Sequence, residues 1–154
     1  MPAHPPQKAS PLLRRTFALA NEIMTQVNAL REASGLDALL YHPKIQEWAA
    51  IRAMEITMLY SHTRPNGSDC ITVGRGLCFE NLLRGDDYTE SWKADIPGYA
   101  ADVITAWYDS PSHRQSMLSS APNLGAISCY VNGDNVYISH LFSMHTLYHM
   151  DYLI

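Results

Sequence analysis

A chain of 154 residues fits one compact domain, and with 47% hydrophobic residues it can fill a core of its own. The formal net charge is −4 and the basic residues form no cluster, which argues against nucleic acid or an acidic membrane surface as the partner. No apolar run approaches the roughly 20 residues that span a bilayer. A small ligand, an ion or another protein remains as the expected binding partner.

The N-terminal half is predicted to be helical. Residues 1–11 carry four prolines and little that could be buried, which predicts a flexible tail, and they lack the apolar stretch of a signal peptide. Apolar residues recur every three to four positions over 12–34, which indicates a helix that ends at Gly35. A second helix is predicted from Pro43 to Tyr60.

The second half combines loops, helices and a hairpin. Turn residues predict a loop over 61–79, and the stretch 83–95 is expected to be irregular. Further elements are predicted as a helix over 98–108, a short helix capped by Ser110 with Pro111 first, and strands over 124–131 and 136–142. A third strand must come from 71–73 or 78–82, since two strands alone are marginal. The order of elements predicts a sheet covered by helices.

Three cysteines allow one disulfide and one leftover thiol. Cys70 and Cys78 lie in the same predicted loop and could form a bridge. Cys129 lies in a predicted strand, where a buried free thiol is common. The sequence leaves the pairing open.

Several segments resemble the CAP superfamily, the cysteine-rich secretory, antigen 5 and pathogenesis-related-1 proteins, and in particular its bacterial SCP-like branch. In the order and spacing of that family, the matching motifs are Asn28-x-x-Arg31 with Gly35-Leu36, Arg52-Ala53-x-Glu55, Ser61-His62-Thr63-Arg64-Pro65-x-Gly67, Ala106-Trp107-x-x-Ser110-Pro111-x-His113-Arg114, Leu124-Gly125-Ala126 and Leu141-Phe142. Together they span residues 28–142.

This resemblance implies an α-β-α sandwich whose small, mainly antiparallel sheet is flanked by helices. The CAP domain would cover residues 12–143, followed by an apolar C-terminal extension, 144–154. The family's cleft, built from two histidines and two acids, would fall on the binding residues His62, Glu80, Asn81, Ser110 and His113.

Two of these positions depart from the family pattern. Ser110 stands where eukaryotic members have the second acid. Phe79 replaces the glycine that usually precedes the Glu-Asn pair, and its ring is expected to narrow the cleft or to shift the backbone of Glu80.

Three functions remain open for such a cleft. The first is a binding module for a small ligand, a lipid or sterol, or a partner protein, in which His62 and His113 could hold a zinc or other divalent ion weakly. The second is a metal-dependent hydrolase, with Glu80 as general base and a histidine as acid. The third is a structural docking domain in which the polar cluster fixes loops to helices, and Arg64 is expected to pair with Glu55.

The binding module is favoured, because no nucleophile with an oriented partner is visible in the sequence. No cofactor is required. By the same resemblance the protein is expected to be secreted or displayed at the cell surface.

Overall fold

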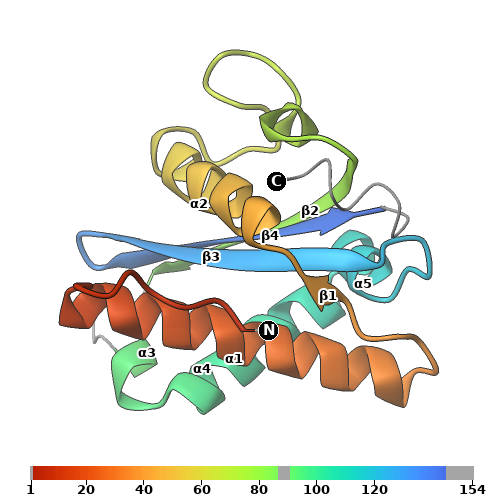
Figure 1. Cartoon of the computed structure of the whole chain (residues 1–154), viewed down its shortest axis with the longest axis horizontal. Coiled ribbons are helices and arrows are strands. Elements are labelled where there is room, and N and C mark those ends of the chain that lie inside the picture. Colours follow the sequence, from red (N-terminus) through yellow and green to blue (C-terminus); the bar gives the residue numbers. More distant parts are fainter. Residues whose placement is uncertain (1, 87–90, 145–154) are drawn as a thin grey trace.

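The computed structural model describes residues 2–86 and 91–144, and in them a four-stranded sheet lies between helices (Figure 1). In chain order the elements are α1 (Pro11–Ala33), β1 (Leu40–Tyr41), α2 (Pro43–Met58), the 3-10 helix η1 (Cys70–Val73), β2 (Leu77–Asp86), α3 (Ser91–Ala94), α4 (Ile96–Asp109), α5 (Pro111–Met117), β3 (Leu124–Asn132) and β4 (Asn135–Ser143). The predicted α-β-α sandwich is confirmed.

The sheet is mainly antiparallel, with the strand order β1-β3-β4-β2. β4 pairs antiparallel with both β2 and β3, while β1 adds only two residues parallel to β3. The β3–β4 hairpin turns at Gly133, whose φ of 63° favours glycine. β2 therefore forms one edge of the sheet, and β3 forms most of the other.

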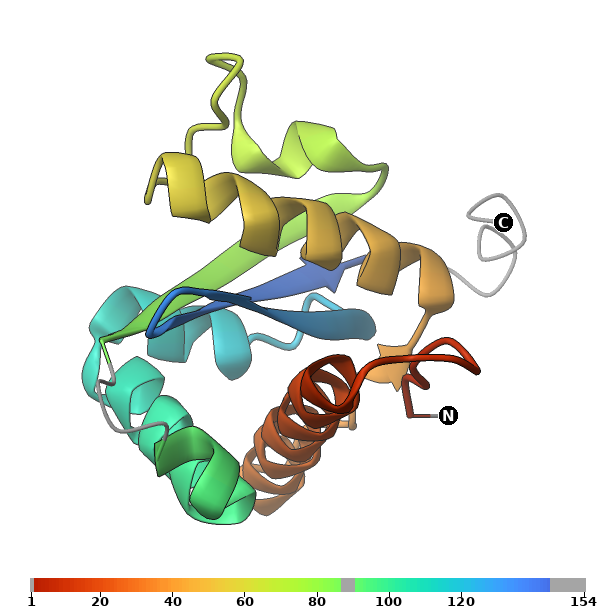
Figure 2. The ribbon, with the colours of Figure 1, turned by 90° about the vertical axis from the view of Figure 1, so that its left-hand side faces the viewer.

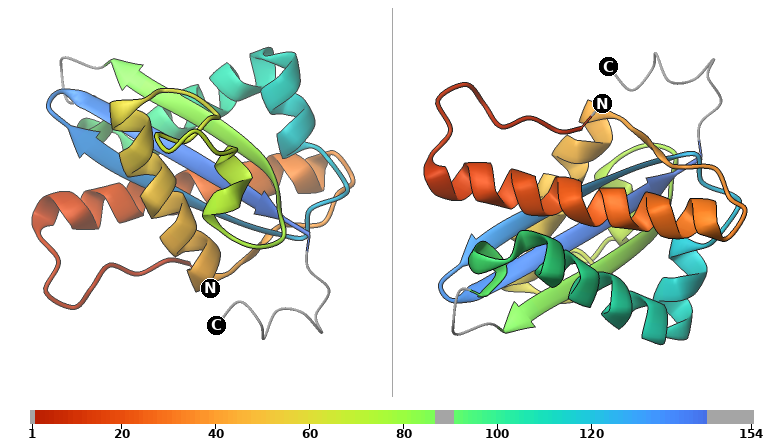
Figure 3. Two further views of the ribbon diagram at one scale, coloured as in Figure 1. Left: turned by 90° about the horizontal axis from the view of Figure 1, so that it is seen from above. Right: turned by 90° about the horizontal axis from the view of Figure 1, so that it is seen from below.

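Helices cover the two faces of the sheet unequally. α2 lies across one face, and α1 and α4 lie across the other (Figures 2 and 3). One apolar cluster between the sheet, α1 and α4 includes Trp107, and a second cluster between α2 and the sheet includes Trp48. Both tryptophans therefore belong to the core. None of the described helices is long and apolar enough to cross a membrane.

The structure corrects two expectations. Residues 83–86 are not irregular, because β4 is long enough to pair with β2 as far as Asp86, and α3 begins at Ser91. Gly85 fits there because a Cβ would meet the ring hydroxyl of Tyr99. Of the two candidates for a third strand, 78–82 lies in β2 as predicted, whereas 71–73 forms η1, capped by Asp69.

The three cysteines are free thiols in this structure. Cys70 contacts the Asp69 carboxylate, and Cys78 contacts the carbonyl oxygen of Phe142. Burial raises the pKa of all three thiols, to about 11 for Cys78. The bridge between Cys70 and Cys78 that the sequence left open is not formed. The predicted C-terminal extension falls, after Met144, outside the described residues.

Candidate functional site

Arg52 of α2 is the buried centre of a polar network. Its Nε donates to Glu80 Oε2 at 2.7 Å, and one terminal nitrogen donates to Glu80 Oε1 at 3.0 Å. It also donates to Glu55 Oε2 and to the Ser61 carbonyl, each at 2.7 Å. The side chains of Arg52 and Glu80 have no exposed surface. The guanidinium therefore fixes α2 to β2 and to the start of the following loop.

The predicted pair of Arg64 and Glu55 is confirmed. Arg64 donates to both carboxylate oxygens of Glu55, with the shortest contact at 2.7 Å. Burial alone would raise the pKa of Glu55, but the hydrogen bonds from Arg64 and Arg52 outweigh burial and hold that pKa below its usual value. Two arginines thus balance the two buried carboxylates, Glu55 and Glu80.

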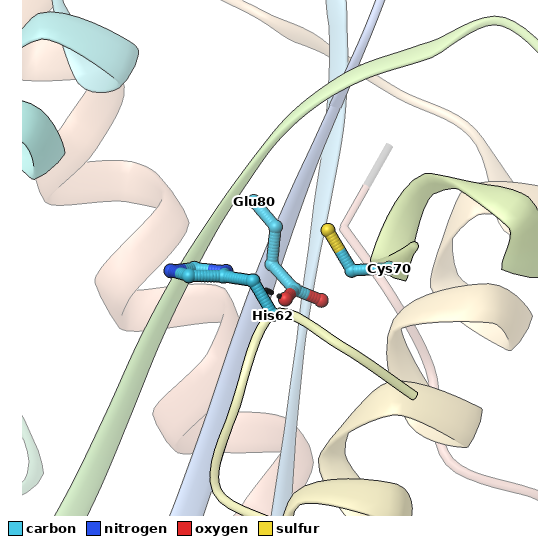
Figure 4. A group of neighbouring side chains, drawn as sticks. All are labelled: His62, Cys70 and Glu80. Atoms are coloured by element: carbon cyan, nitrogen blue, oxygen red, sulfur yellow. Dashed lines mark hydrogen bonds and ion pairs between the residues drawn. The ribbon is translucent and has the colours of Figure 1, made fainter. Parts of the chain in front are cut away.

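His62 contacts Glu80 directly, as Figure 4 shows. Its Nδ1 lies 3.0 Å from Glu80 Oε1. Because a carboxylate only accepts hydrogen bonds, Nδ1 carries a proton, and in the neutral ring Nε2 keeps a free lone pair. The His62 side chain is 58% exposed, so this second nitrogen is open to a ligand.

Cys70 is a neighbour of this pair that the sequence did not reveal. The loop after α2 folds back so that Cys70 N donates to the His62 carbonyl at 2.8 Å, next to an isolated bridge between Thr63 and Asp69. One ligand atom each of His62, Cys70 and Glu80 lies within 4.8 Å of the others. No local motif marks Cys70, because only the fold of the loop brings it near. Burial, followed by the charge of Glu80, raises the Cys70 pKa to about 12.

His113 and Ser110 form the second half of the site, at the start of α5. Ser110 occupies the predicted N-cap position, but its hydroxyl makes no capping bond. Instead, its Oγ lies 2.8 Å from Nδ1 of His113. Asn81, the neighbour of Glu80 in β2, donates from Nδ2 to the His113 carbonyl at 3.0 Å. The adjacent residues Glu80 and Asn81 therefore contact the two histidine-bearing segments separately.

Phe79 does not crowd Glu80. Its ring meets the edge of Phe142, with ring centres 6.2 Å apart, and packs on the apolar cluster below the sheet. Glu80 keeps its regular pairing with Leu141. The register of β2 against β4 shifts between Leu77 and Phe79, just before Glu80.

We expect replacement of His62 with alanine to raise the pKa of His113. Burial, and next the charge of His62, hold the His113 pKa below its ordinary value, so the variant removes one of the two causes. NMR titration of the His113 ring measures the change. His4→Ala is the matched control, since His4 is exposed in the N-terminal segment. An unchanged pKa of His113 in His62→Ala would show that the two rings do not interact, and would contradict the prediction.

The model of the cysteine-rich secretory protein (CAP) family matches residues 24–146. The chain belongs to this family. Solved structures share the fold. An outer surface protein from Borrelia burgdorferi superposes with a TM-score of 0.61 at 16% identity, over 80% of this chain and 90% of that one. No curated protein matches the chain.

Two further structures extend this comparison. An extracellular protein containing an SCP domain from Bacillus anthracis superposes with a TM-score of 0.64 at 14% identity, over 93% of this chain, which spans only 45% of that one. The crystal structure of NaASP2 with Zn²⁺ superposes with a TM-score of 0.54 at 14% identity, over 91% of this chain and 83% of that one. At these identities the CAP fold is shared, and function must be argued from the site.

Two sets of side chains in this CAP domain could hold a metal ion. In the set of His62, Cys70 and Glu80, both Glu80 oxygens already accept from Arg52, and without an ion the pKa of Cys70, raised to about 12 chiefly by burial, keeps the thiol protonated, so an ion would have to displace that proton. A thiol must lose its proton to ligate a metal. In the neutral rings, the imidazole nitrogens of His62 and His113 could ligate an ion without such a change.

Proposed function

We propose that this CAP domain is a binding module that holds its ligand on Nε2 of His62 and Nε2 of His113. The observation that carries the proposal is that each ring already has a partner at Nδ1, Glu80 in one case and Ser110 in the other. An imidazole that donates from Nδ1 to such a partner presents an unprotonated Nε2 to a ligand, and a serine hydroxyl can accept that hydrogen bond as a carboxylate does. The pKa of His113, lowered chiefly by burial, keeps that ring neutral and able to ligate near pH 7.

The contacts of Glu80 weigh against a hydrolase. A general base must be free to accept a proton from water in the cleft. Glu80 instead accepts two hydrogen bonds from Arg52 and one from His62, and its side chain is fully buried. A Cys70 thiol with a pKa of about 12 is a poor nucleophile at neutral pH. Glu80 and Ser110 then act as residues that orient the two histidines.

A divalent transition ion such as zinc suits two imidazole nitrogens. With only two protein ligands, other molecules complete the coordination, so binding is weak and a lipid, small ligand or partner protein can supply the remaining donors. Placement outside the cell agrees with the SCP-domain protein of Bacillus anthracis, which is described as extracellular. We therefore place this module in a secreted or surface-displayed protein.

Calorimetric titration with zinc tests the proposal. The wild-type protein is expected to bind one ion weakly at pH 7.5 and more weakly at pH 5.5, because protons compete with the ion for the imidazole nitrogens. Both His62→Ala and His113→Ala should abolish binding at pH 7.5. Circular dichroism verifies that each variant is folded.

Cys70→Ser is the variant that separates the two candidate sets. If the ion binds the histidine pair, this variant keeps wild-type affinity. Loss of binding in Cys70→Ser, with retention in His113→Ala, would assign the ion to His62, Cys70 and Glu80 and would contradict the proposal. Equal binding by the wild type and His62→Ala would contradict both.

A further inference from the structure

The outer edge of β3 has no strand paired with it along most of its length, and we call this unpaired part the open edge. β1 covers this edge only at Leu124 and Gly125, and from Ala126 to Asn132 no strand of the described residues pairs with it. The free N–H and C=O groups of an edge strand are a template for another strand, and proteins usually protect them with charged residues, above all lysine, or with proline. The stretch from Ala126 to Asn132 contains none of these. The sequence of the open edge therefore does not prevent strand addition, but Ala126 and Ile127 are only 1% and 2% exposed, so an added strand must displace the groups that cover them.

A groove follows the open edge, and we call it the β3 groove. Cavities of about 360, 240 and 290 Å³ succeed one another along the strand. The first two share Ala20 and Gln46, and the last two share Thr16 and Tyr130, so the groove is continuous. α1 lines its whole length, and α2 stands on the opposite side (Figure 2). Its size suits an extended chain.

The charge of the groove limits what it can hold. Glu47 is the one charged side chain among the described residues that line it, and Lys44 pairs with that carboxylate at 2.9 Å. The remaining lining is apolar, or offers neutral amides and hydroxyls. A charged segment would lose hydration there without gaining a partner. An uncharged segment is therefore favoured.

The chain itself shows how a strand is held in this place. Just before β1, the backbone of Leu39 is bound at both polar groups by the side chain of Asn28 in α1. Asn28 Nδ2 donates to the Leu39 carbonyl at 3.1 Å, and Leu39 N donates to Asn28 Oδ1 at 2.8 Å. The next residue, Leu40, pairs with β3 at Leu124. An asparagine of α1 thus aligns a main chain beside the β3 edge, whatever its sequence.

Asn21 repeats this arrangement about two helical turns earlier, beside the open part of the edge. Its Oδ1 accepts from Ala3 N at 3.1 Å, and its Nδ2 donates to the Ala3 carbonyl at 2.8 Å. Ala3 is only 3% exposed, and Pro2 and Ala3 line the first cavity of the β3 groove. The N-terminal segment already places one residue of main chain on the asparagine.

We propose that the β3 groove binds an extended, uncharged peptide segment of a partner protein, which adds as a strand to β3 and replaces Ala3 on Asn21. Main-chain hydrogen bonds to an open edge supply affinity in such complexes, and side-chain pockets supply specificity. The side chain that faces Asn21 is small, as that of Ala3 is. β2, which carries Glu80, lies at the other edge of the sheet, so this surface is independent of the histidine cleft.

Selection from a library of displayed random peptides about eight residues long, the length of the open edge, tests the proposal on the full chain. The expected binders are uncharged and carry a small residue at one fixed position. Added to ¹⁵N-labelled protein, a synthetic binder should shift the amide signals of residues 126–131 and of Ala3. The signal of His62 should stay in place.

Three arginine variants make the test quantitative. Ala50 is exposed on α2 and lines the second cavity, so Ala50→Arg fills the groove and should weaken the selected peptide by about tenfold or more. Met54→Arg, on the same helix outside the groove, is the matched control and should leave affinity unchanged. Ala3→Arg cannot be buried on Asn21, so it removes the internal competitor and should strengthen binding by about tenfold.

Opposite effects of two groove substitutions, with none from the control, would support strand addition. The proposal is overturned if no peptide is selected, if Ala50→Arg and wild type bind alike, or if Ala3→Arg gains no affinity. It is also overturned if the groove takes dodecanoic acid instead of peptides. A concentration-dependent dimer that buries residues 126–131 would assign the edge to a second copy of the chain and would equally overturn it.

Discussion

Replacing Arg52 with methionine is expected to lower the free energy of unfolding by about 3–5 kcal/mol, because it leaves the buried carboxylate of Glu80 without its arginine and with only the exposed His62 ring as a partner. Methionine keeps much of the apolar volume, so the loss reports the charge and not a cavity. Arg64 still donates to Glu55, so Glu80 is the carboxylate that loses most of its hydrogen bonds. Urea unfolding followed by circular dichroism measures the change, and a loss below about 1 kcal/mol would contradict the central role of Arg52.

The double variant Arg52→Met, Glu80→Gln is the control for this prediction. Removing both charges of a buried pair restores stability that removing one of them destroys. We expect the double variant to recover at least half of the loss. The His62 ring should also be held less firmly in the double variant, because a neutral amide replaces its carboxylate acceptor. Zinc affinity therefore separates the stabilising role of Glu80 from its orienting role.

The sequence predicted most of the fold but only part of the site. Helical periodicity and proline positions placed α1, α2 and α4 to within a few residues, because those signals are local. β1 was missed, since two residues carry no pattern, and the extension of β2 to Asp86 depends on the length of β4. Long-range pairing, not local propensity, decides such elements.

The same distinction applies to the site. The pair of Glu55 and Arg64 was predicted from nearness in sequence, and His62, Glu80 and His113 were predicted from family motifs. The second partner of Glu80 could not be foreseen. Only the folded structure shows that Arg52 donates to both carboxylate oxygens of Glu80 in a buried position. These contacts change Glu80 from a candidate base into a residue that orients His62. A sequence motif predicts which residues lie in the site, whereas their hydrogen bonds in the structure indicate what each residue does there.

The stability of the protein is expected to fall steeply in acid because of His140 in β4. Its ring has no exposed surface and stacks on Phe142, with ring centres 3.8 Å apart, and neither ring nitrogen has a hydrogen-bond partner in the described part of the chain. Burial, and next the charge of Arg31, lower the pKa of His140 to about 3. The folded protein therefore holds this imidazole neutral over the whole range in which the unfolded chain protonates it.

The direction of the effect follows from proton binding. In the unfolded chain, histidine titrates near its ordinary pKa of about 6.5. Between that pH and about 3, the unfolded state binds one more proton than the folded state, so the free energy of unfolding decreases by up to about 1.4 kcal/mol for each pH unit lowered. Above pH 6.5 both states are neutral at this position, and His140 contributes no pH dependence.

His140→Leu isolates this contribution. Leucine has a similar volume and leaves no polar atom unpaired, so we expect its stability at pH 7.5 to lie within about 1.5 kcal/mol of the wild type. Carboxylates such as Glu55 weaken both proteins equally in acid, and therefore cancel in the comparison. Urea unfolding at pH 7.5, 5.5 and 4.5 should show the variant gaining on the wild type with every step. If the free energies of unfolding of the two proteins fell in parallel with pH, His140 would be protonated in the folded protein as readily as in the unfolded chain, and the prediction would be wrong.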